Sequence, residues 1–189
     1  MSDVIKFNTE ELIQPVQIQK PKTFDLVPEN HPILREVMPE FDFVNPPVNP
    51  SDFASTMVET CKQHRGIGLS ANQCGFNYRM FVMGAEDNYV AFFNPSVVLK
   101  SLKEVHMMEG CLSFPFLGLR ITRPEEVAVT YQDFNGEWKE ATFTGMSARC
   151  FLHELDHLNG MVYTDKVKPL ALQQGIKKRN KIMKSIGIK

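Results

Sequence analysis

The first clear periodicity of the chain covers residues 50–64, where apolar side chains recur every three or four positions, at Phe53, Met57, Val58 and Cys61. This spacing places them on one face of an α-helix. Asn49 is a favourable N-cap residue, and Pro50 suits the first helical position. We therefore predict a helix from residue 50 to about residue 64 that packs against a core.

A second type of pattern follows, in which short runs of β-branched and aromatic residues favour strands. We predict three separate strands at residues 78–83, 89–93 and 97–99, and a hairpin between residues 127 and 144. In that hairpin apolar and polar positions alternate, and the dipeptide Asn135-Gly136 favours a type I′ turn. These strands indicate an antiparallel sheet.

The helical period returns near the C-terminus, with apolar residues at Ala148, Phe151, Leu152, Leu155 and Leu158. Gly160 lies where the C-terminal cap of this helix is expected. A second helix is predicted over about residues 168–187. Strands followed by two helices indicate an α+β fold, with antiparallel β-sheets packed around the first of these helices and a C-terminal helix beside them.

Length and composition indicate one domain, because 189 residues with 43% hydrophobic residues suffice for one sizeable core. Residues 1–30 contain three prolines, and we interpret them as an N-terminal extension that is either an extended arm on the core or partly disordered. The domain proper then covers residues 31–189. The chain has neither an apolar run of membrane-spanning length nor a signal or transit peptide, so we expect a cytoplasmic protein that binds neither membrane nor DNA.

The segment His153-Glu154-Leu155-Asp156-His157 lies in the predicted helix and has the spacing H-E-x-x-H. Residues i and i+4 lie one turn apart on the same face of a helix, so both imidazoles can bind one divalent cation. Glu154 then lies within reach of a water on that cation. A chance match with two surface histidines is the alternative, and a third ligand decides between the two interpretations.

The third ligand of two protease classes is absent from its expected place. Thermolysin-type enzymes take a Glu downstream of the motif as third ligand, but no Glu follows Glu154 in this chain. Metzincins have a third His at the position where Tyr163 stands here. The four cysteines form no C-x-x-C pair, which indicates reduced thiols, at least one of which is available to a metal. We choose Cys111, in an irregular stretch before residue 114. The weaker alternatives are Cys61, Cys74, Cys150 and His106.

Small residues flank one side-chain amide in the segment from Gly66 to Gln73. Its first two glycines, Gly66 and Gly68, either form a turn or let another chain approach the backbone closely. Neither a following helix nor a downstream phosphate signature accompanies them, so we do not predict nucleotide binding.

Three segments, G-I-G-L-S-A-N-Q at 66–73, E-G-C-L-S at 109–113 and H-E-L-D-H at 153–157, resemble in this order the motifs of the peptide deformylase family. The resemblance covers about residues 31–185. It implies a hydrolase that removes the formyl group from the N-terminal formylmethionine of nascent polypeptides. It also implies that residues 31–189 form the catalytic domain.

The metal site that the resemblance implies consists of Cys111, His153 and His157, with a water as nucleophile in the open fourth position. Glu109 would orient one of these ligands. The donor types alone favour zinc, whereas the resemblance implies Fe²⁺ in the cell, with Zn²⁺, Ni²⁺ or Co²⁺ as substitutes.

The resemblance also implies roles for three residues in catalysis. Glu154 would be the general acid and base, which takes a proton from the water and returns it to the leaving amine. The side-chain amide of Gln73 and the backbone N–H of Leu112 would stabilise the oxyanion.

For substrate binding, we predict an apolar pocket for the methionine side chain that includes Ile67, Met146 and Cys150. Ordinary core packing is the alternative for Ile67 and Met146. The glycines Gly66 and Gly68 would let the nascent peptide pair with the backbone as an added strand.

Three departures from the family pattern concern the surroundings of the site. Ser70 stands where the family usually has Ala, Leu152 stands where Gln is common, and residues 116–119 replace a more polar pattern. They put the substrate contacts after residue 115 in doubt, while the metal ligands and Glu154 fit.

The C-terminal segment 166–189 has eight basic residues and no acidic one. In bacterial relatives a C-terminal helix docks on the ribosome, so ribosome contact is one hypothesis, and a solvated helix face is the other. Two alternatives to a deformylase also stay open: an H-E-x-x-H metalloprotease, and a structural-metal or RNA-binding protein with an idle cleft. A structural site needs a fourth protein ligand and has no use for Glu154, which argues against idleness.

Overall fold

The computed structural model describes residues 22–187. The helices and strands, in chain order, are the 3₁₀ helix η2 (Pro32–Arg35), α1 (Pro50–Gln63), β1 (Gly68–Ser70), the 3₁₀ helix η3 (Ala71–Cys74), β2 (Met80–Ala85), β3 (Asn88–Lys100), β4 (Glu104–Cys111), β5 (Phe114–Pro124), β6 (Glu126–Gln132), β7 (Trp138–Thr144), α2 (Gly145–Leu158), the 3₁₀ helix η4 (Tyr163–Lys166) and α3 (Pro169–Ser185). No helix in this part of the chain is long and apolar enough to cross a membrane.

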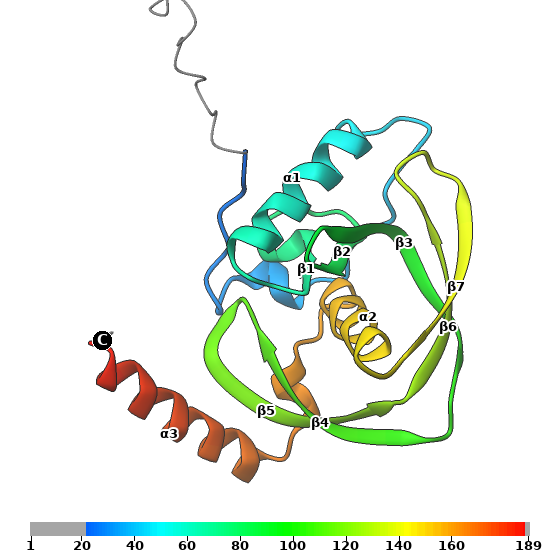
Figure 1. The fold of residues 1–189 in the computed structure, drawn as a ribbon. Helices are drawn as coiled ribbons and strands as arrows, with labels where there is room; N and C mark the ends of the chain where they lie inside the picture. Colours follow the sequence, from blue (N-terminus) through cyan, green and yellow to red (C-terminus); the bar gives the residue numbers. More distant parts are fainter. Residues whose placement is uncertain (1–21, 188–189) are drawn as a thin grey trace, which may run out of the picture.

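The strands form two antiparallel sheets, which confirms the α+β prediction. One sheet has five strands in the order β1-β2-β3-β6-β7, and the other is the hairpin of β4 and β5. Figure 1 shows α2 near the centre of the molecule, between the two sheets, with α1 above it and α3 at the lower left. The central helix and the C-terminal helix therefore lie as the sequence predicts.

Strand β2 shows how the larger sheet divides the core in two. Phe81 and Met83 belong to the cluster around α2, whereas Met80 and Val82 belong to the cluster around α1. Successive side chains of a strand point to opposite faces, so a strand covered on both faces is apolar at every position. The sheet thus holds α1 and α2 on opposite sides.

The prediction of α1 is confirmed, including its N-terminus. The side-chain oxygen of Asn49 accepts a hydrogen bond from the Asp52 N–H at 3.0 Å, and Pro50 is the first helical residue. Met57 and Cys61 are fully buried on the face that packs against the sheet. Helix α2 is confirmed as well, and Gly160 follows its C-cap with a φ of 69°.

Two of the predicted strands prove to be one. Residues 89–93 and 97–99 both belong to β3, which runs without a break and shifts its register against β6 between Phe93 and Ser96. Asn94 has a φ of 48°, which Asn tolerates better than most residues, and its amide donates to the Phe41 carbonyl at 3.0 Å. The strand therefore bends at Asn94-Pro95 and does not end there.

The predicted hairpin is confirmed as β6 and β7, but its turn is not of type I′. A type I′ turn needs a positive φ at both central residues, and only Gly136 has one, at 80°. The Asp133 side chain accepts hydrogen bonds from the N–H groups of Asn135 and Glu137, which stabilises a five-residue loop. This Asp at the start of the loop outweighs the preference of the Asn-Gly pair.

The hairpin of β4 and β5 was not predicted, and residues 109–113 were expected to be irregular. Only Leu112 and Ser113 separate the two strands, and Cys111 is the last residue of β4. The inward face of this hairpin carries Glu109 and Arg123 among its apolar residues. These buried charges break the alternation by which a half-buried strand is recognised.

Residues 22–30, the described part of the predicted N-terminal extension, lie on the domain without helix or strand, and residues 29–30 form a turn. The Phe24 N–H donates to the Thr60 hydroxyl at 2.9 Å, and the Val27 N–H donates to the Gln73 carbonyl at 2.9 Å. The rest of the extension lies outside the described residues. At the other end of the chain α3 has no buried residue, yet Gly175 packs closely on Leu119 of β5.

Candidate active site

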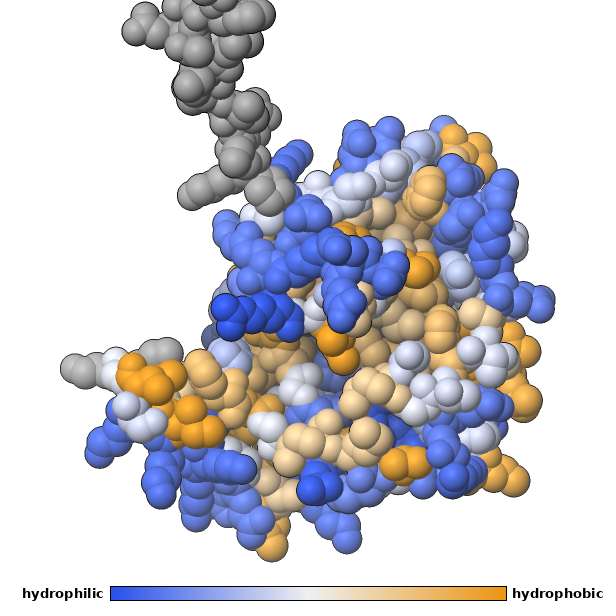
Figure 2. All heavy atoms as spheres, viewed as in Figure 1, coloured by the Kyte–Doolittle hydropathy of each residue, from blue (hydrophilic) through white to orange (hydrophobic). Residues whose placement is uncertain are grey.

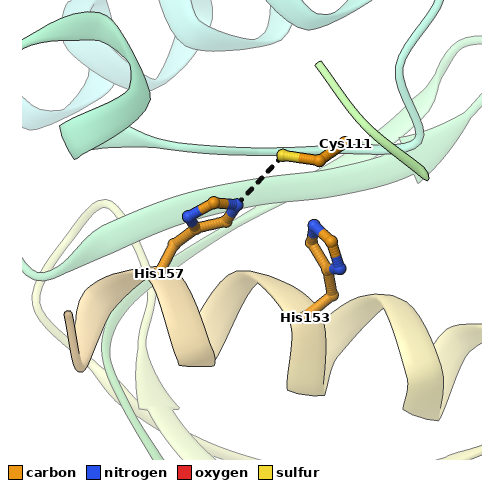
Figure 3. Close-up of side chains that lie close together, drawn as sticks. All are labelled: Cys111, His153 and His157. Atoms are coloured by element: carbon orange, nitrogen blue, oxygen red, sulfur yellow. Dashed lines mark hydrogen bonds between the residues drawn. The ribbon is translucent and has the colours of Figure 1, made fainter. Parts of the chain in front are cut away.

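Helix α2 places two imidazoles on one face, one turn apart. The ring centroids of His153 and His157 are 5.1 Å apart, and the Cys111 sulfur lies 3.2 Å from Nε2 of His157. One donor atom from each of the three residues lies within 4.8 Å of the other two. Figure 3 shows the thiol at the end of β4 facing the two rings on α2. We call these residues the Cys–His–His cluster.

The donor set of this cluster fits a divalent transition metal. Thiolate and imidazole are the ligands that zinc and iron(II) accept, and three protein donors leave a fourth position for water or substrate. Among residues 22–187 no further His, Cys, Asp or Glu joins the group. The cluster therefore has the ligand number of a catalytic site, since a structural zinc site is closed by a fourth protein ligand.

Glu109 fixes the orientation of one ring. Its Oε2 lies 3.0 Å from Nδ1 of His153, which leaves Nε2 for the cluster, and Arg123 donates to both oxygens at 2.6 and 2.9 Å. Arg149 also contacts Oε1. Burial favours a neutral carboxyl, but the hydrogen bonds with His153 and Arg123 outweigh it and lower the pKa of Glu109 to about 2. A buried carboxylate thus holds the imidazole of His153 in place.

The two imidazoles differ in their affinity for protons. Burial acts to lower the pKa of His153, but hydrogen bonds with Cys111 and Glu109 outweigh it and raise that pKa to about 10. Burial, with the nearby positive charge of His153, keeps the pKa of His157 well below its usual value. A ligand nitrogen must be free of protons, so a metal here competes with a proton on His153.

Glu154 lies in the wall of the same site with an unsatisfied oxygen. Its side chain is 4% exposed, and among the described residues Oε2 has no hydrogen-bond partner. Burial is the main reason why its pKa rises to about 7. A carboxyl group that ionises near neutral pH suits a general base, which has to accept and release one proton in each cycle.

Two glycines make room for neighbouring side chains: Gly68 for the Glu154 carboxylate and Gly66 for the Leu112 side chain. A Cβ on Gly68 would overlap Oε1 of Glu154 and lie 2.8 Å from the Cys150 sulfur, and a Cβ on Gly66 would lie 2.8 Å from Leu112 Cδ1. The close approach that the sequence suggested for these glycines is therefore present within the chain itself.

The side-chain amide of Gln73 points into the site. Its nitrogen lies 3.3 Å from the Cys111 sulfur and 3.0 Å from the Ser113 hydroxyl. Its oxygen accepts hydrogen bonds from the N–H and the hydroxyl of Ser70, at 2.9 and 3.0 Å. Ser70, which departs from the family pattern, thus helps to hold the amide. Leu112 lies in the connection between β4 and β5, outside both strands.

A cavity of about 770 Å³ joins these residues. Figure 2 shows the surface hollowed near the centre, where α2 lies in Figure 1. Ile67 and Met146 line the cavity and are each 49% exposed, so they are not core residues. Cys150 also lines it and is buried, with its thiol 3.4 Å from the Ile67 carbonyl. All the residues predicted to bind substrate therefore surround one cavity.

None of the alternatives to Cys111 belongs to the group of potential ligands. Cys61 and Cys74 are buried in the cluster around α1, and burial raises the pKa of each thiol to about 12. His106 lies on the exposed side of β4, where its ring contacts the Thr122 hydroxyl at 3.1 Å. Cys150 lines the cavity without joining the group of potential ligands.

Sequence reasoning missed the charged residues that support the site. Arg123 bridges Glu109 to Asp156, whose Oδ2 lies 2.7 Å from its Nη1, and Arg149 is 3% exposed beside them. The sequence of α2 contains a signal for such a buried charge. Arg149 directly follows Ala148, which belongs to the apolar stripe of a helix that we predicted to be central. A charged residue at such a position needs a buried partner.

The site can be compared with those of known proteins. A family model described as Polypeptide deformylase matches residues 24–173. The peptide deformylase of Finegoldia magna is 38% identical over 148 residues, which cover 77% of this chain and 90% of that protein. The structure of a peptide deformylase from Synechococcus elongatus in complex with actinonin has a TM-score of 0.78 and 31% identity, with 89% of this chain and 91% of that chain covered. The structure of the peptide deformylase from Thermotoga maritima has a TM-score of 0.73 and 33% identity, with 78% and 99% covered.

Proposed function

Since this chain belongs to the peptide deformylase family, whose members remove the formyl group from the N-terminal formylmethionine of nascent polypeptides, we propose that the Cys–His–His cluster and Glu154 perform this hydrolysis. One observation carries the assignment: Oε2 of Glu154, which has no hydrogen-bond partner within residues 22–187, is buried beside a group of three potential ligands. This arrangement supports an open metal site with a base next to it.

Cys111, His153 and His157 would hold the metal on which the family depends. A divalent cation bound there lowers the pKa of a coordinated water towards neutrality and so supplies a nucleophile. We propose Fe²⁺ as the metal in the cell, with Zn²⁺, Ni²⁺ or Co²⁺ as substitutes, because the motifs match a family for which iron is expected. The role of Glu109 is to keep the ring of His153 in the orientation that the cluster needs.

Glu154 moves the proton. It accepts a proton from the attacking water, and it donates that proton to the amine nitrogen as the bond between the formyl carbon and this nitrogen breaks. Formate and a free α-amine leave the site. The Gln73 amide and the Leu112 N–H donate hydrogen bonds to the oxygen of the former formyl carbonyl while it carries negative charge. The hydrogen bonds from Ser70 to Gln73 support this role, because they direct the amide nitrogen into the site.

The methionine side chain would occupy the part of the cavity next to Ile67, Met146 and Cys150. Among the described strands, β1 lies at the edge of its sheet and pairs with β2 alone. An edge strand has backbone groups available to pair with an added strand. We propose that the segment Gly66–Gly68 and β1 bind the nascent peptide through these groups, so that main-chain contacts serve many different sequences.

The setting of the reaction is the place where nascent peptides emerge, and we propose a cytoplasmic enzyme that contacts the ribosome through α3. Five basic residues lie on this helix, at Lys177, Lys178, Arg179, Lys181 and Lys184. Arg179 pairs with Glu29 at 2.8 Å, and among the described residues the four lysines have no acidic partner. They are available to RNA phosphates.

The substitution Glu154→Gln tests the proposed chemistry. Gln has nearly the same size but cannot take up the proton, so formate release from a formyl-Met-Ala-Ser peptide should fall by at least about 100-fold. The variant should retain the metal, measured on anaerobically purified protein. Near wild-type turnover by the metal-loaded variant would contradict the role of Glu154. Cleavage of a matched peptide at an internal bond would instead support a protease.

A further inference from the structure

The segment that joins α1 to the substrate cavity has an unusual residue at its turn. The Gly66 N–H donates to the Cys61 carbonyl and the Arg65 N–H donates to the Lys62 carbonyl, both at 2.9 Å. These two bonds define a Schellman motif, in which the residue after the C-cap is usually glycine because it takes a left-handed conformation. Here this residue is Arg65, with a φ of 56°.

The stability of the fold does not explain this arginine. A side chain with a Cβ is disfavoured at a positive φ, and Arg lacks the local hydrogen bonds by which Asn and Asp tolerate it. Arg65 is exposed. Among the described residues no carboxylate lies within 4.0 Å of its guanidinium, and no side-chain hydrogen bond fixes it. Strained residues without structural compensation are common at functional sites, so a ligand is a better explanation.

The position of Arg65 suggests which ligand it meets. Arg65 and His64 both line the cavity. The other ionisable side chains of its lining, such as Glu109, Arg149 and Glu154, are buried or belong to the Cys–His–His cluster. As far as residues 22–187 form it, the exposed rim of the cavity therefore has basic side chains and no acidic one.

A peptide bound along β1 can leave the site in one direction only. Gly68 adjoins Glu154, and the chain beyond it, from Leu69 to Gln73, is buried. In the opposite direction the backbone passes Gly66 and reaches the surface at Arg65. An extended peptide advances about 3.3 Å per residue, so its third residue lies roughly 7 Å beyond the methionine, within reach of a long side chain at position 65.

From this geometry we propose that Arg65 is a specificity-determining residue that selects nascent peptides with Asp or Glu at the third position. The inference rests on the proposed function, because it requires the formyl group at the Cys–His–His cluster. The guanidinium of Arg65 binds the carboxylate of the third residue at the mouth of the cavity. Since both groups are partly solvated, the effect is one of preference and not of absolute requirement.

The test compares peptides that differ only in one charge. The substrates are formyl-Met-Ala-Asp-amide, formyl-Met-Ala-Asn-amide and formyl-Met-Ala-Lys-amide, in which the C-terminal amide removes a competing carboxylate. For the wild-type protein kcat/KM should be about two- to fivefold higher for the Asp than for the Asn peptide, mainly through KM. High salt should reduce this ratio. In Arg65→Gly the ratio should fall to about one, and in Arg65→Glu the Lys peptide should become the best substrate.

Each ratio is measured within one protein, so a general change in activity cancels. Arg65→Gly should also unfold at an equal or higher temperature than wild type, because Gly relieves the left-handed strain. The control is Lys100→Glu, which makes the same charge change as Arg65→Glu on an exposed residue at the end of β3, outside the cavity lining, and should keep the wild-type ratio.

The two proposals can fail separately. Formate release from formyl-Met-Ala-amide measures the proposed function without a third residue. Suppose that this substrate is turned over, and that the ratio of kcat/KM for the Asp peptide to kcat/KM for the Asn peptide is the same in wild type and in Arg65→Gly. This result would overturn the role of Arg65 and leave the deformylase assignment intact. An equal loss of the ratio in Lys100→Glu would attribute the preference to net charge and overturn the role of Arg65 as well.

Discussion

At the scale of single residues, the site depends on side chains that are missing as much as on those that are present. Gly68 lies against Glu154 and Cys150, and its position leaves no room for a methyl group. The same absence of a side chain keeps the backbone of β1 accessible from the cavity. The identity of this residue therefore affects both the proposed base, Glu154, and the proposed peptide contact.

The substitution Gly68→Ala tests this dependence. The added Cβ must displace the Glu154 carboxylate or move α2 away from β1, so we expect formate release to fall by more than about tenfold. The unfolding free energy should also fall, by about 1–3 kcal/mol, as for other overpacked sites. The measurements are steady-state formate release and thermal unfolding of the same preparation.

Gly110→Ala is the matched control for this prediction. Gly110 also lines the cavity, but a Cβ there meets only the Leu117 carbonyl oxygen, at 4.0 Å. This variant should stay much closer to wild type in both measurements. If both glycine variants lose activity to the same extent, then the contact of Gly68 with Glu154 is not the cause.

At the scale of elements, the site depends on how the β4–β5 hairpin meets α2. Glu109 of β4, Arg123 of β5 and His153 of α2 form one buried network in which a single carboxylate serves two elements. Removing a charge from such a network leaves its partners buried and uncompensated. The network therefore couples the orientation of His153, a proposed metal ligand, to the packing of the hairpin.

Glu109→Gln should weaken metal binding by about 10- to 100-fold, because the amide is a poorer acceptor for the His153 N–H. Retention of the metal during dialysis against a chelator measures this effect without reference to activity. The control is Glu104→Gln on the same strand, where the side chain is exposed and, among the described residues, has no ion pair. Equal metal retention by both variants would contradict a role for Glu109 in holding His153.

The elements also show which features can be predicted from sequence. Helix α2 was predictable because its apolar period and its H-E-x-x-H spacing are both local in the chain. The β4–β5 hairpin was not, because Glu109 and Arg123 occupy inward positions and are satisfied by partners 14 and 40 residues away in the chain. The predicted type of the turn after β6 was wrong for a similar reason. The Asp133 side chain, and not the Asn-Gly pair, determines the conformation of this turn.

At the scale of the whole molecule, the charge is nearly balanced but unevenly distributed. The chain has a net charge of −1, while α3 carries basic residues and no acidic one. Helix α3 has no buried residue and lies against β5, at the edge of the molecule in Figure 1. A basic helix that contributes little to the core is free to serve as a contact surface.

We expect the double substitution Lys177→Gln and Lys178→Gln to weaken binding to ribosomes, measured by co-sedimentation, and to reduce the dependence of this binding on salt. Each phosphate contact releases a counterion, so the loss of two contacts should lower the slope of log K against log salt by roughly two. The control is Lys22→Gln with Lys100→Gln, which removes the same charge from exposed positions outside α3. Formate release from free peptides should be unchanged in both double variants, because no residue of either pair lines the cavity. If the slope of log K against log salt is the same for the two double variants, then α3 is a solvated helix face. Any attraction to RNA would in that case come from the positive charges of the whole surface.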